Sequence, residues 1–274
     1  MNAKFDITLV EALEAIEDYP YLRECFSDYL KWLFDECDEN RRKYDAVYVK
    51  IASSISSLNG LENIFREFGN ILGMNESDFC KAFRFDVDRN KLEILKIGDL
   101  LAEPWSALAL HNHGFDSIKK VSSKKSKMCD FIAIYGSTKF AIEIKNLRSG
   151  DFENYYRWLT DTAHNKQEVF LSSYFANSQG QLHRREEESL QFRMTNLLKD
   201  ETRRQKISEQ LENAKKKYSC QATMLIGFLD LIMILGEFPE MVFDNLENIR
   251  NQFPVSDYLA CCFHETLFCI PQLS

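Results

Sequence analysis

Apolar residues recur every three or four positions through the first third of the chain, which is the spacing of amphipathic helices. The pattern predicts five helices. Asp6 is expected to cap the first helix, and Pro20 to end it. Gly60 is expected to end the third helix, and Ser77 to cap the fifth. The five apolar stripes run, in chain order, from Leu9 to Ile16, Leu22 to Leu33, Tyr44 to Leu58, Ile64 to Ile71 and Ser77 to Phe83. Residues 1–95 are therefore expected to form a helical N-terminal domain.

After Lys96 the pattern changes, and short segments of apolar and β-branched residues alternate with helical ones. The predicted order is a helix, three strands, a long helix and a buried strand, which gives an α/β core with the series αβββαβ over residues 96–235. These elements are expected near residues 97–111, 116–121, 127–135, 138–145, 189–218 and 222–229. Residues 146–190 are expected to form an insertion. Residues 236–274 are expected to form a C-terminal helical extension, with a buried helix around Cys261 and Cys262.

The second and third predicted strands contain charged residues in segments otherwise suited to burial. If Gly136-Ser137 forms a two-residue turn, Asp130 lies directly opposite Glu143. A four-residue loop would instead pair Asp130 with Lys145. In either register Asp130, Glu143 and Lys145 project from one face of the sheet, whereas a loop of odd length would separate them.

The composition is that of a folded globular protein, with 45% hydrophobic and 28% charged residues. The net charge of −8 is unevenly distributed along the chain. Residues 1–95 contain 19 acidic and 12 basic residues, a net of −7, whereas residues 96–235 contain 17 acidic and 21 basic residues, a net of +4. The predicted α/β core is thus mildly basic, and the overall acidity does not exclude a nucleic acid partner.

The eight cysteines lack CxxC spacing and lie in apolar segments, so reduced core thiols and a cytoplasmic location are expected. The first twenty residues include five acidic residues and no apolar run, which predicts no signal peptide. The longest apolar run, residues 222–235, is interrupted by Gly227 and Asp230 and is too short to cross a bilayer. No membrane association is expected.

Two carboxylates on facing strand positions repel each other unless a cation lies between them. Hard oxygen ligands of this kind favour Mg²⁺ or Mn²⁺. Asp130 and Glu143 are therefore the candidate metal ligands.

The series of Asp130, a hairpin and Glu143-Ile144-Lys145 resembles the core of the PD-(D/E)XK nuclease superfamily, over about the middle half of the chain. Cys129 stands where the proline that names the motif is expected. The resemblance implies a restriction-endonuclease-like fold and a Mg²⁺-dependent endonuclease. In this interpretation Asp130, Glu143 and the carbonyl of Ile144 hold one or two metal ions. Lys145 orients or deprotonates the attacking water, or offsets charge on the phosphate.

In that family the leading helix often supplies a further acidic residue to the metal site. Glu103 is the best-placed candidate and is counted among the catalytic residues. Pro104 complicates this assignment, because proline is tolerated only in the first turn of a helix. Either the helix begins near Glu103, or Asp99 is the relevant acid.

Basic residues crowd the approach to Asp130, where they would hold a nucleic acid backbone. They are Lys119, Lys120, Lys124, Lys125 and Lys127. Gln210, on the long helix, is a further candidate for nucleic acid contact, although its spacing from Tyr218 does not fit the Gln-x-x-x-Tyr pattern of some family branches.

These observations favour a nuclease that acts on DNA rather than RNA, in defence or repair. The acidic N-terminal domain would select substrate, regulate the enzyme or mediate assembly with a second copy or a regulatory partner. The alternative is an inactive nuclease-fold module that binds nucleic acid or a protein partner, because fold alone does not fix function.

Overall fold

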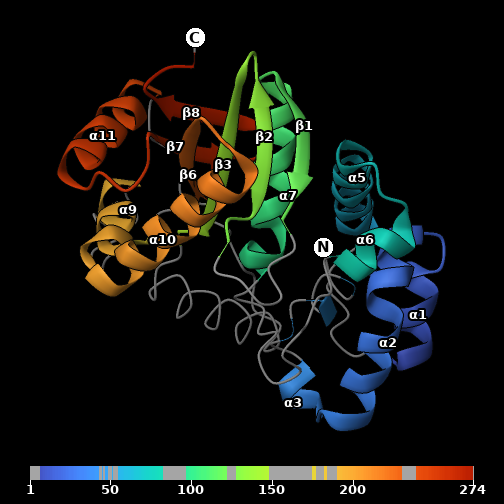
Figure 1. Ribbon diagram of the computed structural model, residues 1–274. Helices are drawn as coiled ribbons and strands as arrows, with labels where there is room; N and C mark the ends of the chain where they lie inside the picture. The colour runs from blue at the N-terminus through green and yellow to red at the C-terminus, as the bar shows by residue number, and fades with distance from the viewer. Residues whose placement is uncertain are drawn as a thin grey trace. The chain divides into compact units, whose positions relative to one another are not determined.

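The structure is a computed structural model that describes residues 7–42, 45, 47–48, 51, 55–82, 97–121, 128–147, 175–176, 182–183, 190–229 and 239–273. The chain divides into two compact units (Figure 1). One comprises residues 1–100 and 150–170, and the other residues 101–149 and 171–274. Among the described residues, no helix has the length and apolar character needed to cross a membrane.

The first unit is helical where it is described, as predicted. Its helices are α1 (Leu9–Ile16), α2 (Pro20–Glu36), α3 (Glu39–Arg42), α5 (Ile55–Leu72) and α6 (Glu76–Ala82). Three predicted boundaries are wrong. Ser77 does not cap α6, because the helix begins at Glu76 and the side chain of Asn75 accepts a hydrogen bond from the N–H of Asp78. Gly60 lies inside α5 rather than at a helix end, because buried side chains such as Phe65 and Phe68 outweigh the cost of about 1 kcal/mol for a glycine in a helix. Thr8, not Asp6, caps α1, in a capping box with Glu11.

The aromatic residues of this unit form its core, as expected. Phe79 of α6 packs edge-on against Phe68 and Tyr21, and its ring centroid lies 5.3 Å from that of Phe65. Glu62 is also buried, and its carboxylate accepts hydrogen bonds from the backbone N–H groups of Tyr21 and Leu22 at the start of α2. A side chain of α5 thereby satisfies N–H groups that have no partner within α2 itself.

The second unit is built on a six-stranded mixed sheet in the order β1-β2-β3-β6-β7-β8. The strands are β1 (Phe115–Lys120), β2 (Phe131–Tyr135), β3 (Thr138–Asn146), β6 (Ala222–Phe228), β7 (Tyr258–Phe263) and β8 (Thr266–Ile270). β3 pairs in parallel with β6, and β6 with β7, whereas the other neighbouring strands are antiparallel. A separate two-stranded sheet joins β4 (Phe175–Ala176) and β5 (Leu182–His183), within the stretch expected to be an insertion.

The hairpin between β2 and β3 has the predicted two-residue turn. Tyr135 pairs with Thr138 and Phe131 with Ile142. Gly136, at the first central position, has a φ of 57°, as a type II′ turn requires. This pairing confirms the predicted even-length turn. The strand pairing ends at Phe131 and Ile142, and Asp130 forms a bend just before β2 with its N–H donated to the Ile142 carbonyl, so the predicted pairing of Asp130 with Glu143 is not part of the ladder.

Helices cover both faces of the sheet (Figure 1). On one face lie α9 (Leu190–Lys199), α10 (Glu201–Tyr218) and α11 (Pro239–Gln252), which share a hydrophobic core with alternate strand residues such as Ile132, Ala141 and Leu225. The long helix expected over residues 189–218 is in fact two helices. Asp200 interrupts it, because its side chain accepts a hydrogen bond from the N–H of Arg203 and starts α10 anew.

Helix α7 (Ile97–Asn112) packs on the opposite face and contradicts the expectation for Pro104. The helix begins at Ile97, so the proline lies in its interior. Proline there removes one backbone hydrogen bond and costs about 3 kcal/mol. Pro104 is itself buried, and so are Ala107 to Leu110. Burial of this apolar face offsets the cost.

The C-terminal segment also differs from expectation. Residues 258–263 and 266–270, predicted as part of a buried helix, are strands β7 and β8 and extend the sheet. An apolar run of this length is compatible with a buried helix or a buried strand. Pairing of β7 with β6, which is distant in sequence, decides in favour of the strand.

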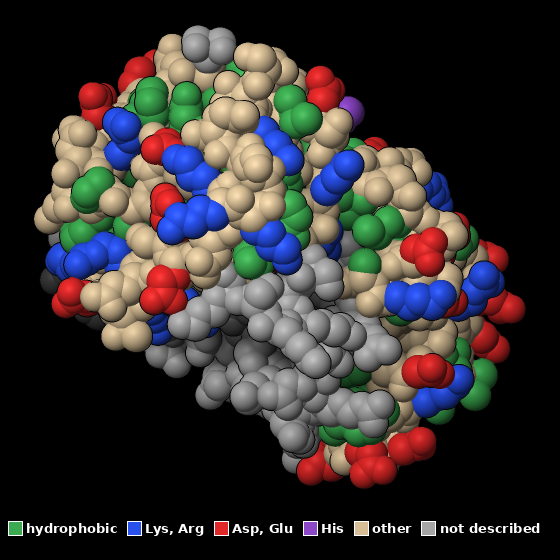
Figure 2. All heavy atoms as spheres, viewed as in Figure 1, with side chains coloured by type: hydrophobic (Ala, Val, Ile, Leu, Met, Phe, Trp, Pro, Cys, Tyr) green, Lys and Arg blue, Asp and Glu red, His purple; other side chains and the backbone are tan. Residues whose placement is uncertain are grey.

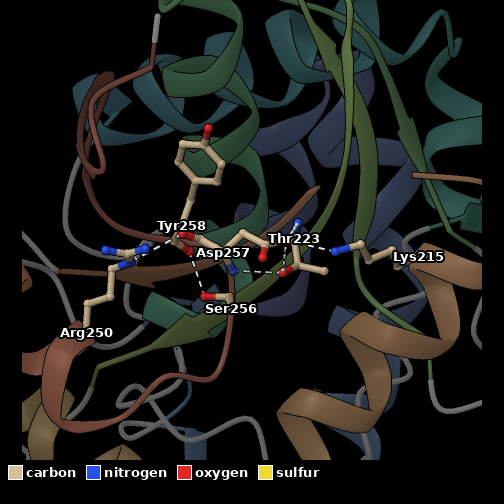
Figure 3. Close-up of polar contacts among 6 residues, drawn as sticks. All are labelled: Lys215, Thr223, Arg250, Ser256, Asp257 and Tyr258. Atoms are coloured by element: carbon tan, nitrogen blue, oxygen red, sulfur yellow. Dashed lines mark hydrogen bonds and ion pairs between the residues drawn. The ribbon is translucent and has the colours of Figure 1, made fainter. Parts of the chain in front are cut away.

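A polar cluster joins β6, α10 and the segment before β7 (Figure 3). The carboxylate of Asp257 accepts hydrogen bonds from the backbone N–H and the hydroxyl of Thr223, at 2.9 and 3.0 Å. It also pairs with Lys215 at 3.0 Å, while its own N–H donates to the Thr223 hydroxyl. Arg250 donates to the Asp257 carbonyl. The cluster links the start of β6 and the segment before β7 to the C-terminal end of α10 by hydrogen bonds and an ion pair.

Candidate active site

Asp130 lies immediately before β2 and is fixed by its backbone on both sides. Its N–H donates to the Ile142 carbonyl at 3.0 Å, and its carbonyl accepts from the Val121 N–H at 2.9 Å. Its carboxylate accepts the N–H of Ile144 at 2.8 Å, in place of a further ladder hydrogen bond. The N–H and C=O of one strand residue point to the same side of the strand. The Ile144 carbonyl is therefore directed toward the side of β3 on which Asp130 lies.

Glu143 and Lys145 lie two residues apart on β3 and therefore share a face of the sheet. Glu143 is 0% exposed, which is rare for a carboxylate. Its Oε1 pairs with the Lys145 ammonium, whose side chain remains partly exposed. Among the residues that the structure describes, Oε2 of Glu143 is a buried oxygen with no hydrogen-bond partner. An orphaned buried carboxylate oxygen is costly and calls for a functional explanation.

Glu103, from α7, lies close enough to act on this pair. It forms an ion pair with Lys120 of β1, whose ammonium also lies 5.6 Å from the centre of the Phe131 ring. Its negative charge helps to raise the pKa of both Asp130 and Glu143. The side chain of the alternative acid, Asp99, lies outside the described part of α7.

The site holds more negative charge than its surroundings stabilise. Burial raises the pKa of the Asp130 carboxyl, and the charges of Glu143 and Glu103 raise it further, against the smaller effects of Lys145 and the Ile144 N–H. Burial also raises the pKa of Glu143. The positive charge of Lys145 lowers this pKa most, and that of Lys206 lowers it less. A cation of higher charge density would relieve this excess.

Helix α10 brings two more polar side chains to the site. Gln210 donates its amide to the Met128 carbonyl at 3.1 Å, two residues before Asp130, and its amide oxygen is buried without a partner among the described residues. Lys206 lies one helical turn earlier and acts electrostatically on Glu143. The sequence interpretation included Gln210 but missed Lys206. The spacing of four residues between them, which places both on one helix face, is the signal that would have found it.

The predicted lysine cluster is only partly described. Lys119 is exposed on β1, whereas Lys120 is occupied by its contact with Glu103. Lys124, Lys125 and Lys127 lie outside the described residues.

The donor set is small for a protein metal site. Within the described ranges, no three His, Cys, Asp or Glu side chains form a group that could hold a metal ion. The available oxygens are those of Asp130 and Glu143 and the Ile144 carbonyl. Such a set suits Mg²⁺, which typically keeps several waters and takes one or two carboxylates together with substrate phosphates.

The arrangement can therefore bring a divalent cation, a phosphate and an ammonium group together where β2 begins and β3 ends. Comparison with known proteins gives no independent assignment: no family model, curated protein or solved structure matches this chain.

Proposed function

We propose that the protein is a Mg²⁺-dependent nuclease with a restriction-endonuclease-like core, which hydrolyses phosphodiester bonds of nucleic acid, DNA in preference to RNA. One observation carries the proposal. Asp130, Glu143 and Lys145 lie together where β2 begins and β3 ends, and Oε2 of Glu143 is buried with no hydrogen-bond partner among the described residues. The series α7, β1, β2, β3, α10 and β6 also agrees with the predicted αβββαβ order.

In this proposal each residue has a separate task. Asp130, Glu143 and the Ile144 carbonyl would hold the cation, which, when bound, lowers the pKa of a coordinated water and stabilises charge on the phosphoryl oxygens. The N–H of Ile144 holds the Asp130 carboxylate in place. As an ammonium, Lys145 would orient the attacking water and offset charge on the phosphate; as a neutral amine, it would instead accept a proton from that water. Glu103 holds Lys120 and adds negative charge at the rim of the site.

A second candidate function rests on the ion pairs themselves. Lys145 already pairs with Glu143, and Lys120 with Glu103, so two of the three acids have an ammonium partner. If these pairs persist in solution, no cation binds, and the unit is an inactive module that binds nucleic acid or a protein partner. Buried ion pairs of this kind also occur where they have a purely structural role.

Metal binding and cleavage together separate the two functions. We expect isothermal titration to detect Mg²⁺ or Mn²⁺ binding to the full chain, and Asp130→Asn to abolish it. We also expect Mg²⁺-dependent cleavage in a panel of linear, circular, branched and single-stranded DNA and RNA. A folded protein that binds neither cation and cleaves none of these substrates would exclude the nuclease and favour the inactive module.

A further inference from the structure

One side of α10 carries a stripe of basic and amide side chains. Residues at intervals of three and four lie along one line of a helix. The five residues at these intervals are Arg203, Lys206, Gln210, Asn213 and Lys217. We refer to them as the α10 stripe. It runs directly beside the buried row that anchors the helix to the sheet, which consists of Ile207, Leu211 and Ala214.

The stripe contains no acidic residue, although α10 contains three. Glu201, Glu209 and Glu212 all lie at other angular positions of the helix. The three cations of the stripe, by contrast, are exposed. Figure 2 shows Lys and Arg side chains gathered over α10 on this face of the second unit, with acidic side chains among them. The separation of charge around the helix thus leaves one continuous line without negative charge.

The stripe passes the candidate active site. Gln210, at its centre, is anchored to the Met128 carbonyl at 3.1 Å, two residues from Asp130. Lys206, the next member, acts on the charge of Glu143. The stripe is therefore fixed with respect to the two carboxylates and extends beyond them in both directions along the helix.

The existing contacts of the end members are weak enough to be exchanged. Arg203 pairs with Asp200 at 3.2 Å, with both side chains well exposed, and such pairs contribute little. Lys217 lies 5.3 Å from the centre of the Tyr218 ring, also at the surface. Both cations can turn toward an incoming anion without exposing a buried partner.

We propose that the α10 stripe binds the phosphate backbone of a nucleic acid strand and leads it to the Asp130–Glu143 site. This inference rests on the proposed function for the identity of the polymer. From Arg203 to Lys217 the helix rises about 21 Å, at 1.5 Å per residue. Phosphates of one duplex strand recur about every 3.4 Å along the axis, so the stripe spans about six of them. A free phosphate would occupy one cation, whereas a strand engages all three.

The test compares two triple variants of the full chain that remove the same charge. The stripe variant is Arg203→Gln, Lys206→Gln and Lys217→Gln. The control variant is Lys31→Gln, Lys81→Gln and Lys216→Gln, which removes three exposed cations outside the stripe. Binding of labelled single-stranded DNA, duplex DNA and RNA is measured in EDTA, so that cleavage does not intervene, at about 50 to 200 mM salt. Circular dichroism confirms that both variants fold.

We expect the stripe variant to bind at least about tenfold more weakly, and the slope of log affinity against log salt to become shallower by about 2 to 3, at about 0.7 to 0.9 per lost phosphate contact. The control variant should keep most of the wild-type affinity and slope. Equal losses in the two variants would overturn the inference, since net charge alone would then explain them. So would unchanged binding by the stripe variant, or absence of nucleic acid binding by the wild type.

Cleavage by the wild-type chain in Mg²⁺ separates this inference from the proposed function. Stripe-dependent binding without cleavage would support the inference and contradict the nuclease. Cleavage by the wild type together with unchanged binding by the stripe variant would do the reverse.

Discussion

Glu143 and Asp257 are carboxylates of the same sheet-bearing unit, and their surroundings differ in what they leave unsatisfied. Asp257 is partly exposed and accepts three hydrogen bonds, from Thr223 and Lys215. Partial burial raises the pKa of Asp257, but these hydrogen bonds outweigh it and hold the pKa below its usual value. Glu143 is fully buried, and in the part of the chain that the structure describes it has one lysine partner and one oxygen without a partner; burial raises its pKa.

The difference separates a structural cluster from a candidate active site. A carboxylate whose pKa is lowered stabilises the fold in its charged form. Carboxylates with raised pKa values are unfavourable in their charged form, and groups of this kind occur more often at functional sites than elsewhere. The comparison predicts that changes around Glu143 alter activity and metal response, whereas changes around Asp257 alter stability alone.

The largest expected effect is that of Lys145→Ala on cleavage. We expect a loss of about 10²- to 10³-fold in kcat, by analogy with removal of one preorganised donor that stabilises developing charge. The measurement is single-turnover cleavage of whichever substrate the panel identifies. Lys216→Ala, at an exposed position of α10, is the control and should cleave at the wild-type rate. Wild-type cleavage by Lys145→Ala would contradict the assigned role.

The next effect is on stability. Asp257→Ala leaves the buried Thr223 N–H at the start of β6 without its acceptor, which costs about 1 to 3 kcal/mol. Hydrogen exchange at the amides of β6 and β7 should accelerate by about tenfold or more, while cleavage by the folded protein is retained. Asp244→Ala removes the same charge from an exposed position of α11 and should change exchange little. If hydrogen exchange changes equally in both variants, the Asp257 cluster does not stabilise the pairing of β6 and β7 as we describe.

The contributions of Asp130, beside Glu143, and of Asp257 to the free energy of unfolding should also change with pH in opposite directions. The pKa of Asp130 is raised from 3.8 to about 8, so between these values the folded protein holds a proton that the unfolded chain has lost. In the absence of divalent cations its contribution to stability is complete below about pH 4 and is lost as pH rises toward 8. Asp257, with its lowered pKa, contributes above about pH 4 and loses its contribution as pH falls.

Between pH 5 and 8, therefore, the Asp130 contribution should dominate this comparison. In EDTA, the free energy of unfolding of the wild type should fall from pH 5 to pH 8. We expect urea unfolding to show that this fall is smaller in Asp130→Asn by at least about 1.4 kcal/mol, the equivalent of one pKa unit. Mg²⁺ at pH 8 should stabilise the wild type by mass action and leave Asp130→Asn unchanged. A wild-type profile parallel to that of Asp130→Asn, with no response to Mg²⁺, would contradict the raised pKa and the metal site together.

The sequence predicts the local geometry of the candidate site better than its surroundings. The proximity of Asp130 to Glu143 depends on the side-chain period of a strand and on a two-residue turn at Gly136, both of which are local. The interior position of Pro104 could not be predicted, since its cost is offset by burial against distant residues. The same holds for β7, because the segment around Cys261 becomes a strand only through its pairing with β6.

The position of α10 over the site likewise depends on tertiary contacts. Gln210 reaches Met128, which lies 82 residues away in sequence, and no local pattern specifies this contact. Asp200 was also missed as a helix start, although its side chain caps α10 in an ordinary way. Periodicity thus predicts which residues share a face, and packing determines which faces meet.

The smallest effect tests whether the two lysines of this comparison are equivalent. Lys215 pairs with Asp257 where both side chains are partly exposed, at 29% and 47%, and exposed pairs contribute about 0.2 to 1 kcal/mol. Lys215→Gln should therefore lower the free energy of unfolding by no more than about this amount, since Thr223 still donates to Asp257. Lys145→Gln removes the only side chain described as paired with Glu143 and leaves a buried carboxylate, so it should destabilise more at pH 8 than at pH 5. Equal and pH-independent losses in urea unfolding would show that burial of Glu143 does not make its ion pair differ energetically from that of Asp257, and the distinction between the two carboxylates would then fail.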